Sequence, residues 1–216
     1  MHLWALFTIS LSLGCHHSMQ TISLKDYSLE SLPKNQQISG HFKLRGTGLK
    51  RVLGSIEFDV IAKDPHQLYL SIDSFFNQPA RIVTYDGQNL YGIEEDKLEA
   101  ILNLPIEPEE LVEILLRNYS HNPKEIKKMS TKNNQIFILY HSENSLLLDI
   151  DPRSHDILKR ELRNHSNQLI YSVTYEDFPK RFYLEANYKH KKHAMILSSE
   201  DVKLNQGTFN EQLFCR

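Results

Sequence analysis

Cysteine is scarce in this chain, since only Cys15 and Cys215 occur among 216 residues. Two cysteines cannot build the framework of several bridges that stabilises many small secreted domains. The fold must therefore rest on a hydrophobic core, and a hydrophobic fraction of 40% is sufficient for one globular domain. We expect one main domain, in which Cys215 is an incidental thiol near the end of the chain.

An excess of charge of either sign is also absent. The 25 Lys and Arg residues nearly balance 27 Asp and Glu residues, which gives a formal net charge of -2 and a pI near 6.6. Binding to nucleic-acid phosphates needs concentrated positive charge. We therefore expect no nucleic acid among the partners of this protein.

The common signatures of catalytic chemistry are missing. The eight glycines form neither a phosphate-binding loop nor a dinucleotide fingerprint, and no Gly-x-Ser-x-Gly motif presents a serine nucleophile. The acidic pairs Glu94-Glu95 and Glu109-Glu110 stand at the starts of expected helices, where they stabilise the positive end of the helix dipole. We expect neither an enzyme nor a bound cofactor.

Histidine is abundant, with 11 residues, and His190 and His193 lie in the basic segment Lys189–His193. The neighbouring lysines repel a divalent cation, and no adjacent Asp, Glu or Cys completes a set of ligands. We expect no metal site there. The segment is interpreted as a solvated hairpin turn, or else as a patch that contacts anionic headgroups or an acidic partner.

Long hydrophobic runs are absent after the first residues, where the apolar stretch Leu3–Leu13 ends just before Cys15. A helix of about eleven residues cannot cross the hydrocarbon core of a membrane, which needs roughly twenty. The stretch is therefore interpreted as part of a signal peptide. The following cysteine is typical of a bacterial lipoprotein. We predict a lipoprotein signal peptide at 1-14, a covalent lipid on Cys15 within a linker at 15-27, and the folded domain at 28-216. The alternative is an ordinary secretory signal that contains a cysteine.

Alternating apolar residues predict a mainly β fold. Turn residues, such as Asp86-Gly87, separate the runs and indicate successive antiparallel hairpins. The expected strands are 38–44, 56–60, 68–72, 80–85, 89–93, 135–141, 146–150, 157–163, 169–175, 182–188 and 194–204. A sheet of about eleven strands in one domain is expected to curve strongly or form a barrel.

The centre of the chain changes to helical spacing and predicts two short helices, at 95–102 and 107–117. Pro108 can occupy the first helical position of the second helix, after Glu107. The apolar stripes consist of Leu98 and Leu102 in the first helix and Leu111, Ile114 and Leu115 in the second. Because the second helix also has apolar residues off its stripe, we expect it to pack into a concave surface as a plug or lid.

Two adjacent aromatic residues, Phe75 and Phe76, follow an expected strand and precede Asn77 and Pro79. Hairpin loops are usually polar at this position. One interpretation is that one ring is buried and the other half-exposed. The other is an apolar loop tip that contacts acyl chains or a membrane.

Four segments of the sequence resemble the LolA/LolB superfamily of lipoprotein carriers and receptors. They are 38–44 as the first strand, 75–78 as a protruding apolar loop, 97–116 as a helical lid, and 201–214 as the closing strand and tail. The chain is most similar to the outer-membrane lipoprotein receptor LolB. The resemblance implies an incomplete β-barrel, of about eleven strands here, with short central helices as a lid over a hydrophobic cavity.

The resemblance also implies a function without catalysis. We expect a protein that is anchored to the outer membrane by its lipid and faces the periplasm. It would bind acyl chains of lipoproteins or lipids, help to deliver them to the outer membrane, and receive cargo from a LolA-like carrier. Phe75 and Phe76 are the expected loop contacts. The expected cavity or lid residues are Phe42, Phe58, Leu70, Leu98, Leu102, Leu111, Ile114 and Leu115.

Three alternatives stay open. The apolar residues could fill a core that has no cavity. The same fold could serve as a structural or assembly lipoprotein of the envelope. A metal-binding β-protein would require a third ligand beside His190 and His193.

Overall fold

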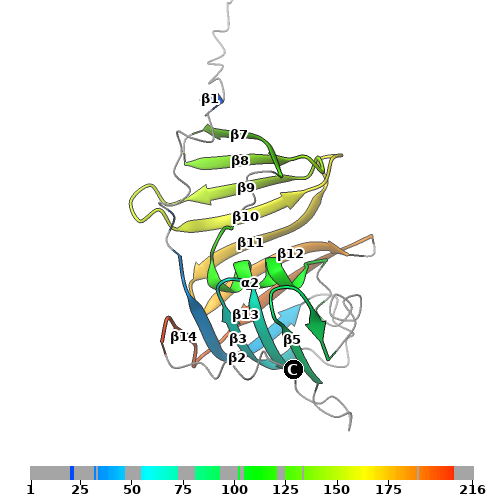
Figure 1. The fold of residues 1–216 in the computed structure, drawn as a ribbon, viewed down its shortest axis with the longest axis vertical. Coiled ribbons are helices and arrows are strands. Elements are labelled where there is room, and N and C mark those ends of the chain that lie inside the picture. The colour runs from blue at the N-terminus through cyan, green and yellow to red at the C-terminus, as the bar shows by residue number, and fades with distance from the viewer. Residues whose placement is uncertain are drawn as a thin grey trace, which may run out of the picture.

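A computed structural model describes residues 20–21, 32, 34–46, 55–72, 81–92, 102, 105–120, 125–132, 134–188 and 190–206. The predicted signal peptide and the sites predicted at Cys15, Phe75, Phe76 and Leu98 lie outside these residues. The described part forms one antiparallel sheet of fourteen strands and a helix that packs against it (Figure 1).

Five strands joined along the chain by hairpin pairing form the N-terminal part of the sheet. They are β2 (Gln37–Gly46), β3 (Ser55–Lys63), β4 (Gln67–Ile72), β5 (Arg81–Tyr85) and β6 (Leu90–Tyr91). Apolar and polar residues alternate along β3 and β4, and the apolar side chains are buried. This period of two is what places one face of each strand in the core.

The remaining strands continue the same antiparallel pattern. They are β1 (Gln20–Thr21), β7 (Ile126–Lys132), β8 (Gln135–Tyr140), β9 (Ser145–Ile150), β10 (Ile157–Arg163), β11 (Leu169–Asp177), β12 (Arg181–Tyr188), β13 (Lys191–Ser198) and β14 (Lys203–Leu204). β1 lies in the predicted linker and pairs with β7.

The two parts of the sheet join where β13 pairs with β2, with Leu197 opposite Leu44. The strand order is therefore β1-β7-β8-β9-β10-β11-β12-β13-β2-β3-β4-β5-β6, and β14 also pairs with β2. Within the described residues the end strands β1 and β6 do not pair with each other, so the sheet is unclosed. The predicted mainly β fold with a curved antiparallel sheet is confirmed, with more strands than the eleven expected.

The helix α2 (Pro108–Leu116) shows how strongly the sheet curves (Figure 1). It contacts β2, β3 and β4 on one side. On the other side it bonds to β10 and β11, through Arg160 and Tyr175. Since β12 and β13 separate these two groups in the strand order, the sheet must wrap around α2. Of the other expected helix, at 95–102, only Leu102 is described, and it is helical and buried.

One predicted strand is wrong, and one strand was not predicted. The single strand expected at 194–204 is instead divided into β13 and β14, because the chain turns at Ser199–Val202 and packs on Gly40 of β2. A Cβ atom on Gly40 would lie 3.0 Å from Val202 Cα, so a larger residue would obstruct this approach. β7 was not expected, because a bulge between Ile126 and Lys128 interrupts its alternation.

No helix in the described part of the chain is long and apolar enough to span a membrane.

Candidate functional site

The central helix α2 begins and ends as its sequence predicts. Pro108 occupies the first turn, preceded by Glu107 in extended conformation, with φ -70° and ψ 155°. Glu109 and Glu110 place negative charge in the first turn. The helix ends at Arg117, which adopts the left-handed conformation with φ 56° and closes the last turn through its backbone N–H.

One face of α2 is apolar and covers the N-terminal part of the sheet. Its side chains surround a small void together with residues of β2, β3, β4, β12 and β13. The lining residues are Leu44, Phe58, Leu70, Leu102, Leu111, Ile114, Leu115, Leu184 and Leu197. The void has a volume of about 20 Å³, whereas ligand pockets typically have ~300–1,000 Å³. With α2 in this position, the apolar void that the described residues line is too small for a ligand.

The structure brings most of the predicted cavity residues together. Six of them line the void: Phe58, Leu70, Leu102, Leu111, Ile114 and Leu115. Phe42 is fully buried beside them, and its ring stacks against Phe58 and Phe182 with centroids 6.4 Å apart in both pairs. These residues share one apolar interior, and their role toward acyl chains stays a prediction.

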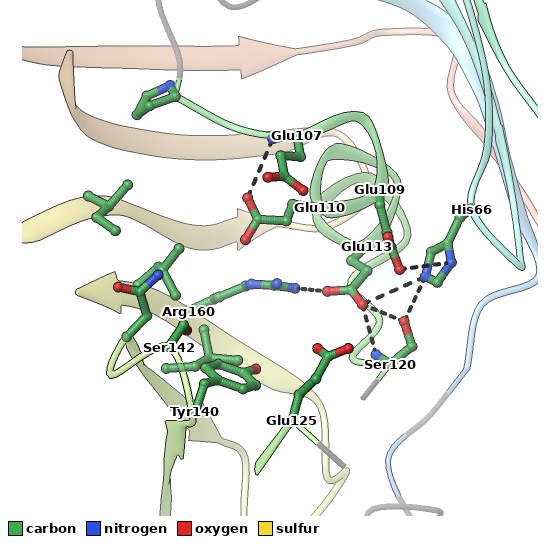
Figure 2. Close-up of a pocket in the computed structure, with 15 residues that line it drawn as sticks. His66, Glu107, Glu109, Glu110, Glu113, Ser120, Glu125, Tyr140, Ser142 and Arg160 are labelled. Atoms are coloured by element: carbon green, nitrogen blue, oxygen red, sulfur yellow. Dashed lines mark hydrogen bonds and ion pairs between the residues drawn. The ribbon is translucent and has the colours of Figure 1, made fainter. Parts of the chain in front are cut away.

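The opposite face of α2 is charged and carries a buried cluster around Glu113 (Figure 2). Arg160 of β10 forms an ion pair with Glu113, with Nη1 and Oε2 2.7 Å apart, and both side chains are less than one-tenth exposed. Ser120 donates to Glu113 from its backbone N–H at 3.1 Å and also from its hydroxyl. We call Glu113, Arg160, Ser120 and the neighbouring His66 the Glu113 cluster.

The charges of the Glu113 cluster compensate one another. Burial alone would raise the pKa of Glu113, but Arg160 and the contacts with His66 and Ser120 outweigh it and hold the pKa at about 2. Burial would lower the pKa of Arg160, yet the tyrosines and carboxylates around it keep the guanidinium charged. The cluster is therefore an ionised pair inside the molecule.

His66 connects this cluster to the β3–β4 turn. Its Nδ1 lies 3.2 Å from Glu109 Oε1, its Nε2 lies 2.7 Å from Ser120 Oγ, and Glu113 Oε1 is 3.8 Å away. The contact with Glu113 raises the pKa of His66, burial opposes the shift, and the charge of Glu109 adds to it. His66 thus links the turn to both the first and the second turn of α2.

The C-terminal end of α2 is attached by hydrogen bonds from Asn35 and Arg117. Asn35 donates to the carbonyl of Leu116 at 2.7 Å and exchanges two further hydrogen bonds with Asn118. Arg117 Nε donates to the carbonyl of Ile157 at 2.6 Å. Several backbone and side-chain groups therefore hold this end of the helix in place.

A polar cavity of about 740 Å³ lies next to the charged face of α2. Glu110 borders it and accepts hydrogen bonds from Tyr171 Oη at 3.3 Å and from the Glu107 N–H at 3.4 Å. Burial raises the pKa of Glu110, and Arg160 partly offsets this shift. Further lining residues are Glu125, just before β7, Tyr140 at the end of β8, and Ser142 in the β8–β9 turn, as Figure 2 shows. Asn144 of the same turn also lines it.

Sequence reasoning missed the Glu113 cluster. Glu109 and Glu110 were assigned only to the helix dipole, Glu113 was not singled out, and Arg160 was treated as an ordinary strand residue. One signal was available, because Arg160 lies two positions before Leu162 and so shares a face of β10 with this buried leucine. A charged residue at an inward position indicates a buried partner.

The basic segment near the β12–β13 turn has a mixed environment. His190 lies exposed at the turn with φ 62°, whereas His193 is buried at an inward position of β13. The expected solvated turn therefore holds for His190 and not for His193. Among the described residues, no group of three or more His, Cys, Asp or Glu side chains is placed to hold a metal ion.

Comparison with known proteins gives a likeness in fold. No protein-family model and no curated protein matches the chain. A crystal structure of a LolA superfamily protein from Nitrosomonas europaea matches with a TM-score of 0.58 and 13% identity, over 87% of this chain and 96% of that protein. A DUF1329 family protein from Desulfovibrio piger matches with a TM-score of 0.50 and 8% identity, over 86% of this chain and 92% of that protein. Neither likeness bears on the closer prediction of LolB, which stays a prediction. The chain therefore has the fold of a LolA superfamily protein.

Proposed function

We propose that this protein binds the acyl chains of lipoproteins or lipids in the apolar interior beneath α2. The supporting observation is the arrangement of α2, which lays Leu111, Ile114 and Leu115 over the apolar face of an unclosed, curved sheet. The fold of a LolA superfamily protein agrees with such a role. Each methylene moved from water into this interior contributes about 0.8 kcal/mol, so binding needs no catalytic group.

The small void makes α2 a lid in this proposal. A volume of about 20 Å³ cannot hold an acyl chain, so the helix must move away from β2–β4 to admit one. The unclosed sheet leaves an edge at which the interior can widen. Cargo binding and displacement of α2 are then one event.

The cellular setting is part of the same proposal. We assign the protein to the periplasmic face of the outer membrane, with its anchor on Cys15 and a role in receiving lipoproteins, as a LolB-like receptor would. Phe75 and Phe76 would contact acyl chains or the membrane. The absence of enzymatic activity belongs to this proposal too.

A fluorescent fatty acid tests the proposal on the purified protein. Leu111→Gln places an amide in the void lining and is expected to weaken binding at least tenfold, at about 1.4 kcal/mol per factor of ten. The matched control Leu158→Gln alters a leucine of β10 that is 41% exposed, and it should bind like the wild type. Thermal unfolding checks that both variants fold. Equal binding by the two variants, or no saturable binding by the wild type, would refute the proposal.

A second candidate is a structural or assembly lipoprotein of the envelope. The small size of the void among the described residues favours it, because a scaffold needs a packed core and no space for cargo. The same titration separates the two candidates, since a scaffold would bind no fatty acid at this site.

A further inference from the structure

Glu113 is the meeting point of three elements that lie far apart in the sequence. It sits in the middle of α2, pairs with Arg160 from β10, and lies 3.8 Å from His66 in the β3–β4 turn. β10 and β4 are separated in the sheet by several strands. The Glu113 cluster therefore ties α2 to both walls of the curved sheet (Figure 2).

The contacts of His66 favour the protonated form of its ring. The Ser120 hydroxyl gives its proton to the ionised Glu113, so its oxygen can only accept from His66 Nε2. On the other side of the ring, Nδ1 faces the Glu109 carboxylate at 3.2 Å. A protonated imidazole can donate at both positions, whereas a neutral imidazole that donates to Ser120 leaves the lone pair of Nδ1 facing a carboxylate.

The two ends of α2 differ in how they are held. The C-terminal end is bonded to Asn35 and Ile157 by groups that do not titrate near neutral pH. The first turns depend on the Glu113 cluster and on the hydrogen bond from Tyr171 to Glu110. Loss of the charge on His66 would therefore weaken the attachment of the first two turns and leave the C-terminal end in place.

We propose that His66 and Glu113, with Arg160 and Ser120, form a proton-dependent latch that keeps α2 closed over the apolar interior. Protonated His66 holds the helix to the β3–β4 turn, and loss of the proton releases it. The inference rests on the proposed function, since it concerns access to the same apolar interior.

The direction of the pH effect follows from the charges around His66. Its neighbours are Asp64 on its own turn, Glu109 and Glu113 on α2, and Arg160 of β10 behind Glu113. The contact with Glu113 and the other carboxylates raise the pKa of His66 in the closed state. Closure is therefore favoured at pH values below the ordinary pKa of 6.5, and this contribution is lost as the pH rises through the higher pKa of the closed state.

Hydrogen exchange of the purified full chain tests the latch without any ligand. After correction for the intrinsic exchange rate, the protection of amides in α2 is expected to fall about fivefold between pH 6 and pH 8.5. Amides of β11, such as Val173, serve as the internal reference. His66→Asn removes the titrating ring and suits the left-handed backbone at φ 59°. The matched control His165→Gln alters an exposed histidine of the β10–β11 turn.

The variant with Asn at position 66 should show low protection of α2 at both pH values, and the His165→Gln control should behave like the wild type. Protection of α2 that does not change with pH in the wild type, or a change that survives His66→Asn, would overturn the latch. A fatty-acid titration of the same samples separates the two proposals. If the exchange of α2 depends on pH as expected but no fatty acid binds, the latch is supported and the proposed function is refuted. If fatty acid binds but the exchange of α2 does not depend on pH, the proposed function is supported and the latch is refuted.

Discussion

At the scale of residues, α2 has apolar side chains on one face and a buried ion pair on the opposite face. Leu111, Ile114 and Leu115 face the apolar void, while Glu113 faces Arg160. A buried ion pair is costly to desolvate, and it persists only where hydrogen bonds satisfy the remaining polar atoms. Ser120, Tyr171 and Asn118 supply these bonds to the two charges.

Removing one charge of this pair is expected to be far more damaging than removing an exposed one. Arg160→Met leaves the carboxyl group of Glu113 buried without its ion-pair partner, and should lower the free energy of unfolding by about 3–5 kcal/mol. The control Arg181→Met breaks an ion pair with Glu176 in which both side chains are about half-exposed. It should lower the free energy of unfolding by less than ~1 kcal/mol. Urea unfolding measures both. Equal decreases in the free energy of unfolding in the two variants would contradict a buried, ionised pair of Glu113 and Arg160.

Residue identities explain why the apolar interior could be predicted and the Glu113 cluster could not. Burial of Phe58 and Leu70 follows from the alternation within single strands. The partner of Glu113 lies 47 positions away on β10, and His66 approaches from the opposite side. Such pairings depend on how the sheet wraps around α2, which no local pattern contains.

At the scale of elements, α2 is the part whose position decides whether the interior is filled. Pro108, the acidic first turn and the apolar stripe predicted this helix from local chemistry alone. β7 was not predicted, because its bulge exposes Lys127 and Lys128 in succession and so breaks the alternation of apolar and polar residues. Strand pairing tolerates such an interruption, because the neighbours β1 and β8 hold the strand in place.

Shortening one lid side chain should enlarge the void at a measurable cost. Leu115→Ala is expected to lower the free energy of unfolding by about 2–5 kcal/mol, because Leu115 is 1% exposed and the site cannot collapse fully. The enlarged void should also bind a small apolar ligand such as benzene. The control Leu158→Ala should lower the free energy of unfolding by less than ~0.5 kcal/mol and should not bind benzene. A loss of similar size in both variants would contradict the packing of α2 onto the void.

At the scale of the whole molecule, an unclosed sheet wrapped around one helix provides an interior that can be filled by side chains or by cargo. The chain shares this fold with a LolA superfamily protein at 13% identity, so the architecture persists while nearly all side chains differ. The general pattern of strands was readable from the sequence. The join between β13 and β2, which connects the two parts of the sheet, was not, because it pairs segments about 150 residues apart.

A spin-labelled fatty acid tests the central claim most directly, because its unpaired electron broadens the NMR signals of nearby methyl groups. We expect the strongest broadening at Leu70, Leu111, Ile114 and Leu115, which line the void, and little at the exposed residues Ile82 and Leu158. An acyl chain beneath α2 would give this pattern. Broadening confined to the exposed methyl groups, with the lining residues unaffected, would contradict the account.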